Sequence, residues 1–541
     1  MRLLAITDFS ELATGYGVYC KELLTGLQAR GHEVIELACG CIENDPKLNN
    51  VKWTVIANQP AASNERAKKA YDTLPLAEYG AWQFEDLCIT YKPDVVLLFR
   101  DIWFDEFVLR SPLRDYFAVV CMPAIDAEPQ NKNWLRVYEK ADSVLCYTEW
   151  GLNLMRNSGY NIPVYKTAPP VAPKEFVRLP NKERFKQALN LGDIRIAGFV
   201  GRNQRRKLFP ELYSAFAQYL KEEPDSNVFL YSHTSYPDRG WELDEEISKY
   251  GISNRVLFTY ICQNCRFIEP SLFRGPASYC ARCQYQNSMV LARGDVSLTN
   301  TEMCKIYNLF DLYIQYAQNE GYGMPLAEAA ACGVPGIAVD YSAMSEVCKL
   351  INGKLIPVKA FHQELETGRK FAIPDNQVLV QYLKDFFNRP YQMQDRDGIL
   401  ARIEYNKNWQ FENTINAWDE AIKLVKPKLP WNNPPRIYPI PDNMIQNVDN
   451  TNFAKWLIGG VLRQPELLGS DMELRLIRDL NNQATPGGCG GQYYHEHNGV
   501  MVDHRLVNHL EKFNRELAFN VFRNMLAIRN KWEELRVQRC E

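Results

Sequence analysis

Short apolar runs alternate with segments of helical periodicity along most of the chain. Residues 3–7, 94–99, 117–122 and 141–147 are compact apolar runs, typical of strands covered on both faces of a parallel sheet. Residues 18–29 instead place apolar side chains at the spacing of one helix face. This alternation predicts a doubly wound α/β domain.

The same pattern resumes near residue 194 and predicts a second domain of this kind. Residues 196–200, 227–232 and 256–260 are predicted strands, and residues 409–422 form a predicted closing helix. Residues 426–442 contain six prolines and no periodicity, so we expect an extended linker there. The predicted organisation is an N-terminal domain (1–180), a C-terminal domain (181–425), the linker, and a helical extension (443–541).

One stretch in the second domain combines a strand, a glycine turn and a helix start. After the apolar run 309–317, Gly321 to Gly323 predict a tight turn, and the following helix formers end at Gly333. Glu320 precedes the turn and Glu328 lies in the helix. Helix-start amides attract phosphate, and carboxylates accept hydrogen bonds from sugar hydroxyls. The stretch therefore predicts a site for a ligand that carries both phosphate and sugar.

This stretch closely resembles the Glu-x7-Glu motif of the large retaining glycosyltransferase family with the GT-B fold, family 4 in the sequence classification. Gly31-His-Glu-Val34 resembles the same family's first domain. The resemblance implies two Rossmann-like domains that face a cleft. It assigns the donor sugar to Glu320 and the nucleotide ribose to Glu328. The remaining donor-binding positions that it implies are Gly321, Tyr322, Gly323, Met324, Pro325 and Leu326.

A basic loop follows the predicted strand 196–200. Arg202 and Lys207 lie five residues apart, which suits two oxygens of a diphosphate leaving group. The loop resembles the family's Gly-Arg-x4-Lys motif, which implies that both residues stabilise that leaving group. In the first domain, the family's glycine-rich loop would face the donor, although an ordinary tight turn is equally consistent. Its residues here are Gly15, Tyr16 and Gly17.

The first domain departs from the family pattern in one respect. Many members carry a histidine near the cleft, but residues 33–232 contain none. Asp126 stands in a Pro-x-x-Asp-x-Glu-Pro string and is our candidate for orienting the acceptor hydroxyl; the alternative is an aspartate that caps a turn. In the front-face mechanism attributed to the family, the leaving phosphate takes the acceptor proton. The resemblance thus implies catalysis by Glu320, Asp126, Arg202 and Lys207 without a catalytic metal.

Two Cys-x2-Cys pairs interrupt the second domain between residues 261 and 294. Fourteen residues separate the pairs, a spacing typical of zinc ribbons, in which four thiolates form a closed structural site. Two disulfides are the alternative. Arginines and aromatic residues alternate within the insert, which suits either nucleic-acid contact or a small packing module. The expected zinc ligands are Cys262, Cys265, Cys280 and Cys283.

The composition narrows the choice of partner and compartment only slightly. The chain has 62 basic and 65 acidic residues, so net charge predicts neither nucleic acid nor an acidic substrate. No apolar window is long enough for a transmembrane helix, and the N-terminus lacks a signal-peptide pattern. Fifteen cysteines, most placed singly in apolar runs, indicate a reducing compartment. We expect a cytoplasmic protein, in the host cytoplasm if it is viral, of undetermined oligomeric state.

Three functions remain open at this point. The preferred one is transfer of a sugar from a nucleotide-sugar, with UDP favoured, to a hydroxyl of a glycan, glycolipid or protein. The second is transfer to hydroxymethylated bases of viral DNA, which the cysteine insert favours. The third is a non-catalytic protein that binds sugar nucleotides. A histidine cluster in the extension suggests loop packing or a second metal site, and its members are His495, His497, His504 and His509.

Overall fold

The computed structural model describes residues 1–432 except 13, 74, 75, 110, 112, 293–295 and 366, together with 434, 469, 474, 494–497 and 500–503. Two compact units are present. The first consists of Met1–Phe9, Gln28–Val120 and the described residues from Val425 onward. The second consists of Ser10–Leu27 and Cys121–Leu424.

The first sheet is built from parallel strands, as the buried apolar runs predict. Its order is β3-β2-β1-β4-β5-β6-β7, with parallel registers between β1 and β2, β1 and β4, β2 and β3, and β6 and β7. The strands are β1 (Arg2–Asp8), β2 (Glu33–Ile42), β3 (Thr54–Gln59), β4 (Val95–Leu98), β5 (Ala118–Cys121), β6 (Ser143–Cys146) and β7 (Val164–Thr167). The helices between them are α1 (Gly15–Ala29), α2 (Glu65–Thr73), α3 (Phe84–Tyr91), α4 (Ile102–Leu109), α5 (Lys132–Tyr138) and α6 (Glu149–Arg156), with 3-10 turns η1 (Pro46–Asn50) and η2 (Ala77–Tyr79).

Helix α1 begins three residues earlier than its apolar pattern predicts. Gly15, Tyr16 and Gly17 form its first turn instead of a separate tight turn before it. The Thr14 hydroxyl accepts a hydrogen bond from the Gly17 amide at 3.0 Å, and the Thr14 carbonyl accepts one from Val18. Threonine in this capping role offsets the low helix propensity of the two glycines.

The second sheet has the order β12-β13-β10-β9-β8-β14-β15-β16, with β11 paired to β10. Strands β10, β9, β8, β14, β15 and β16 run parallel, so the carboxyl ends of β10, β9, β8 and β14 meet at one edge. The strands are β8 (Arg195–Val200), β9 (Val228–His233), β10 (Val256–Cys262), β11 (Ile268–Leu272), β12 (Ala277–Ser278), β13 (Met289–Leu291), β14 (Leu312–Gln315), β15 (Gly336–Val339) and β16 (Lys354–Ile356).

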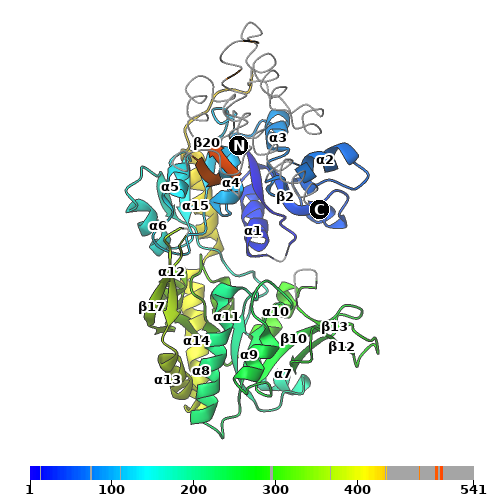
Figure 1. Ribbon diagram of the computed structural model, residues 1–541, viewed down its shortest axis with the longest axis vertical. Coiled ribbons are helices and arrows are strands. Elements are labelled where there is room, and N and C mark those ends of the chain that lie inside the picture. Colours follow the sequence, from blue (N-terminus) through cyan, green and yellow to red (C-terminus); the bar gives the residue numbers. More distant parts are fainter. Residues whose placement is uncertain are drawn as a thin grey trace. The chain divides into compact units, whose positions relative to one another are not determined.

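Helices cover this sheet, and an antiparallel hairpin follows it. Helix α8 packs against α13, and α11 packs against α14 (Figure 1). The helices are α7 (Lys182–Ala188), α8 (Phe209–Glu222), α9 (Leu243–Lys249), α10 (Asn300–Tyr307), α11 (Met324–Ala331), α12 (Ser342–Leu350), α13 (Asn376–Phe387), α14 (Tyr391–Asn408) and α15 (Phe411–Leu424), with the 3-10 turn η3 (Arg205–Lys207). The hairpin pairs β17 (Val358–Gln363) with β18 (Lys370–Pro374).

These two mainly parallel sheets confirm the predicted α/β class. Within the described part of the chain, no helix is both long enough and apolar enough to cross a bilayer. Residues 426–432 form neither helix nor strand, and the Leu429 amide donates to the Asp115 carbonyl. In the predicted extension, β19 (Tyr494–His497) and β20 (Val500–Asp503) pair antiparallel. The predicted helices of the extension, together with His504 and His509, lie outside the described residues.

Candidate active site

The turn between β14 and α11 depends on two glycines. Gly323 has a φ of 97°, a left-handed conformation that residues with a side chain rarely adopt, and it precedes the first residue of α11. A Cβ on Gly321 would lie 3.0 Å from the Cβ of Ala124, so a side chain would crowd that neighbour. The turn therefore brings the first amides of α11 close behind Glu320, as the sequence predicts. Pro325, in the first turn of α11, suits a helix start.

Glu320 lies buried at the centre of a charged cluster. Its carboxylate pairs with the Lys207 ammonium and lies 2.9 Å from the Arg206 guanidinium. The Gln315 amide donates to the same carboxylate at 3.0 Å, and the Glu320 backbone amide donates to the Ser342 hydroxyl. Burial alone would raise the pKa of Glu320, but the two cations outweigh it and lower the pKa to about 2. The carboxylate is therefore ionised. Burial lowers the pKa of Lys207, and the charge of Glu320 opposes this effect.

The basic loop after β8 supplies both cations that contact Glu320, but the motif predicts only one of them, Lys207. Lys207 is buried at the end of η3 and reaches Glu320, whereas Arg202 has a 69% exposed side chain that pairs with Asp238 at 3.1 Å. Arg206, which the motif does not include, takes a place beside Glu320. Its guanidinium also donates to the Asn319 carbonyl at 3.0 Å. The tight η3 turn orients Arg206 and Lys207 toward one carboxylate. The only sequence signal for the role of Arg206 was its place in a run of three basic residues.

Glu328 meets a different environment on α11. The Tyr307 hydroxyl, at the end of α10, donates to its carboxylate at 2.6 Å. Burial raises the pKa of Glu328 to about 7, and this hydrogen bond only partly opposes the rise. The environments of the two glutamates therefore shift their pKa values in opposite directions: the pKa of Glu320 is lowered and that of Glu328 is raised.

Asp126 lies next to the same cluster. One carboxylate oxygen accepts from the Arg369 guanidinium at 3.0 Å, and the other accepts from the Asn319 side chain at 2.9 Å. Because Asn319 directly precedes Glu320, the aspartate is tied to the donor-side turn. Burial raises the pKa of Asp126, although Arg369 opposes this effect. Arg369 lies between the two strands of the hairpin and stacks on Trp134. Nothing in the sequence pointed to Arg369 as a residue of this site.

The other predicted donor positions contribute in different ways. The side chains of Tyr322 and Leu326 are buried, and the Tyr322 hydroxyl accepts from the Trp409 indole, so these residues can face a ligand only through their backbone. Met324 lines a small pocket together with Tyr19 and other residues of α1, α15 and the segment at 170–171. Gly15, Tyr16 and Gly17 form the turn of α1 that precedes Tyr19.

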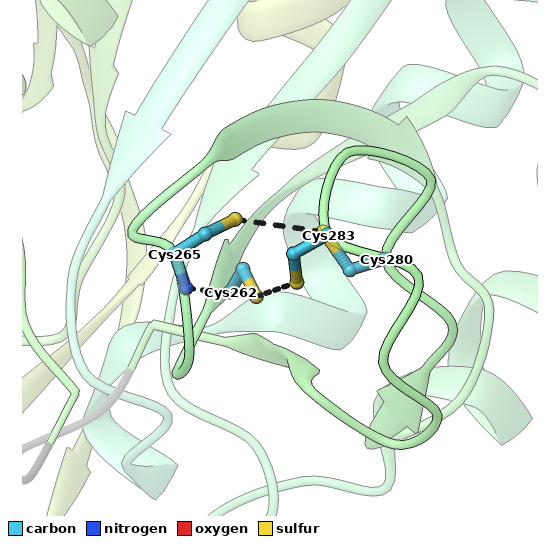
Figure 2. Close-up of side chains that lie close together, drawn as sticks. All are labelled: Cys262, Cys265, Cys280 and Cys283. Carbon is cyan, nitrogen blue, oxygen red and sulfur yellow. Dashed lines mark hydrogen bonds between the residues drawn. The ribbon is translucent and has the colours of Figure 1, made fainter.

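The four cysteines of the insert converge as the spacing predicts (Figure 2). Their sulfur atoms all lie within 4.8 Å of one another, and Cys262 and Cys280 are buried. Two of the sulfur–sulfur distances are 3.5 Å, between Cys262 and Cys283, and 3.8 Å, between Cys265 and Cys280. All four are free thiols, which excludes the alternative of two disulfides in this structure. Four sulfurs this close together form a donor set that fits a tetrahedral metal ion.

Both cysteine pairs also share one backbone pattern. In the first knuckle, the Cys262 amide donates to the Phe267 carbonyl and the Arg266 amide donates back to Cys262; in the second, Cys280 pairs in the same way with Tyr285 and Gln284. Arg266 and Gln284 both adopt left-handed φ angles, 59° and 61°. The two cysteine loops are therefore folded alike around the four sulfur atoms.

The basic side chains of the insert are already engaged. Arg266 pairs with Glu302, Arg274 pairs with Glu269 at 3.0 Å, and Arg282 stacks on Phe267. Arg293 lies outside the described residues. These arginines are therefore less available to phosphates than their number in the sequence suggests. The aromatic side chains Tyr279 and Tyr285 remain exposed.

Comparison with known proteins places this site in context. Residues 279–380 match the family described as "Glycosyl transferases group 1". Over 113 residues the chain is 27% identical to the UDP-N-acetylglucosamine–peptide N-acetylglucosaminyltransferase GtfA subunit of Streptococcus pneumoniae, covering 20% of this chain and 22% of that protein. The corresponding subunit of Streptococcus gordonii is 22% identical over 129 residues, 24% of this chain and 23% of that protein. The chain thus spans about a quarter or less of the curated relatives it matches.

Solved structures match over much more of the chain. Sucrose-phosphate synthase of Thermosynechococcus elongatus superposes with a TM-score of 0.55 at 17% identity, covering 78% of this chain and 98% of that one. HepE of Anabaena, solved in complex with UDP and glucose, gives a TM-score of 0.52 at 13% identity, covering 79% and 100%. At these identities the likeness shows a shared fold.

Proposed function

We propose that this chain, a GT-B protein with a domain of the glycosyl transferases group 1 type at residues 279–380, transfers a sugar from a nucleotide-sugar donor to a hydroxyl acceptor. The observation that carries the proposal is the cluster of Glu320, Lys207 and Arg206 behind the first turn of α11. It joins a carboxylate for sugar hydroxyls with cations and helix amides for a diphosphate.

UDP is the proposed donor nucleotide. A structural neighbour was solved with UDP and glucose, and the partial relatives are named for transfer from UDP-N-acetylglucosamine to a peptide. The names of these relatives also favour a protein acceptor over a glycan or a glycolipid. Thirteen free thiols among the described residues support the cytoplasm as the compartment.

The proposed chemistry is substitution at the anomeric carbon with retention. The bond from that carbon to the diphosphate oxygen breaks, and a bond to the acceptor oxygen forms on the same face. The acceptor proton passes to the departing phosphate oxygen. Negative charge grows on the diphosphate during this step, and Lys207, Arg206 and the α11 amides are arranged to stabilise it. We keep Arg202 as a further cation for the diphosphate, which requires it to leave Asp238.

Nucleotide release from a panel of UDP-sugars tests this proposal. The panel is measured with protein, glycan and lipid acceptors, and with DNA that contains hydroxymethylated pyrimidines. We expect release of UDP that depends on an acceptor and is lost in Glu320→Gln. Failure to bind or turn over any nucleotide-sugar would overturn the proposal. Release only with the modified DNA would replace the protein acceptor by the DNA acceptor, which the engaged arginines of the insert now disfavour.

Asp126 is proposed to orient the acceptor hydroxyl. Asp126→Asn should lower kcat/KM for the acceptor by about tenfold to 100-fold because the hydroxyl loses its charged partner. KM for the donor should change little. Glu364→Gln is the matched control. Glu364 is a second carboxylate partner of Arg369, at 3.3 Å, and the proposal gives it no contact with the acceptor, so the acceptor kinetics should stay unchanged. A fall in melting temperature with unchanged acceptor kinetics would instead assign Asp126 to a purely structural role.

The insert is proposed to hold one structural Zn²⁺ between Cys262, Cys265, Cys280 and Cys283. Bound there, the ion would crosslink the two knuckles and leave no open coordination position for a substrate.

The metal content of the purified protein tests this assignment. We expect about one zinc ion per chain, falling to nearly none in Cys280→Ser, together with a lower melting temperature. Cys304→Ser is the control, because Cys304 is a buried thiol outside the insert and should leave the zinc content unchanged. A wild-type protein that takes up no zinc after reduction would refute the site.

A further inference from the structure

We infer that the cysteine ribbon positions the ribose-binding carboxylate, through Arg266 and helix α10. The inference rests on the proposed function, because it assigns Glu328 to the ribose of the donor. It adds a task for the described residues of the insert, to which the proposed reaction assigns no other role. Arg266 and Tyr307 are positioning residues in this scheme.

The first step is the attachment of Arg266 to the ribbon. Arg266 directly follows Cys265, and its amide donates to the Cys262 carbonyl at 2.9 Å. Its φ of 59° is set by the turn of the first knuckle. The backbone of Arg266 is therefore fixed when the knuckle is closed around its cysteines, and it is released when they separate.

The second step is the attachment of Arg266 to the start of α10. Its guanidinium donates to the Ser297 carbonyl at 3.0 Å and to the Glu302 carboxylate at 2.9 Å. The Glu302 carboxylate also accepts from the Thr299 amide, and the Glu302 amide donates to the Thr299 hydroxyl, which together form the capping box of α10. One carboxylate thus joins the knuckle to the cap of the helix. The Arg266 side chain is about half exposed, so this link contributes through geometry more than through energy.

The third step leads along α10 to the donor site. Glu302 lies in the first turn and Tyr307 is the last residue, about 7.5 Å further along the helix axis at 1.5 Å per residue. Tyr307 is fully buried and donates to Glu328 at 2.6 Å. A short capped helix moves as one body, so a shift at its start displaces the hydroxyl that holds Glu328.

The test compares two ligands with the full chain. UDP carries both ribose hydroxyls, and 2′,3′-dideoxyuridine diphosphate lacks them, so the ratio of their Kd values reports how well Glu328 is placed. We expect Arg266→Ala to bind zinc normally but to lose about threefold to thirtyfold of the wild-type preference for UDP. Arg266→Lys should recover part of the loss. Arg274→Ala is the matched control, because Arg274 lies in the same insert but pairs with Glu269 and stacks on Tyr260.

Metal removal supplies an independent arm of the test. A zinc chelator should reduce the same preference in the wild-type chain, and added Zn²⁺ should restore it. An unchanged ratio of the two Kd values in Arg266→Ala would overturn this inference and leave the proposed function standing. Equal weakening of both ligands would also overturn it, because a general loosening of the domain has that signature. A wild-type chain that binds neither ligand would overturn the proposed function and the inference together.

Discussion

Lys207→Met should lower the rate of sugar transfer by about 100- to 1,000-fold at saturating donor. The substitution keeps an unbranched apolar side chain in the buried position and removes only the ammonium group. The rate falls because that cation stabilises charge that develops on the diphosphate as the sugar leaves. Initial rates with UDP-sugar and acceptor measure the effect.

Arg206 and Gln315 still contact Glu320 in this variant, so the carboxylate is not left without a partner. The melting temperature verifies that the fold persists. Arg202→Met is the informative comparison, because Arg202 belongs to the same motif but pairs with Asp238. A comparable loss would mean that Arg202 turns to the donor during the reaction. A Lys207→Met enzyme within about threefold of the wild-type rate would contradict the proposed role of Lys207.

The affinity for UDP should rise as pH increases through about 7. Burial raises the pKa of Glu328 to about 7, and the ionised carboxylate accepts hydrogen bonds from ribose hydroxyls better than the protonated one. Glu328→Gln should weaken UDP binding about tenfold to 150-fold above this pH and remove the dependence. Calorimetric titration with UDP at several pH values measures both effects.

Folding stability should show the opposite trend. The pKa of Glu328 is higher in the folded protein than its ordinary value of 4.5, so the folded state holds the proton more tightly. This contribution to stability is complete below pH 4.5 and is lost as pH rises through about 7. Glu328→Gln should therefore flatten the change in unfolding free energy across this window. A Kd for UDP that is independent of pH in the wild-type chain would contradict the ribose role.

The sequence predicted most of what depends on local pattern. Buried parallel strands leave continuous apolar runs, and the glycine turn before α11 leaves a recognisable string with Glu320 and Glu328. The convergence of the four cysteines could be predicted from the spacing of the two Cys-x2-Cys pairs. Each of these features is specified within a short stretch of chain.

Features that depend on distant partners could not be predicted in this way. Arg206 reaches Glu320 because η3 turns it toward a residue more than a hundred positions away, and nothing local distinguishes it from Arg205. The same holds for Arg369, whose contact with Asp126 joins the hairpin to a segment from much earlier in the sequence. The first turn of α1 was missed because two glycines argue against a helix, whereas Thr14 caps it.

The thiols of the ribbon have a consequence for redox behaviour. Two sulfur pairs, Cys262 with Cys283 at 3.5 Å and Cys265 with Cys280 at 3.8 Å, each join one knuckle to the other. An oxidant that removes four electrons from the cluster would form two disulfides along these pairs and use up all four proposed zinc ligands at once. Oxidation of the thiols and loss of the proposed zinc ion would then be a single event. If Arg266 transmits the state of the ribbon to α10, donor binding would weaken in an oxidising cell and recover when reductant and Zn²⁺ return.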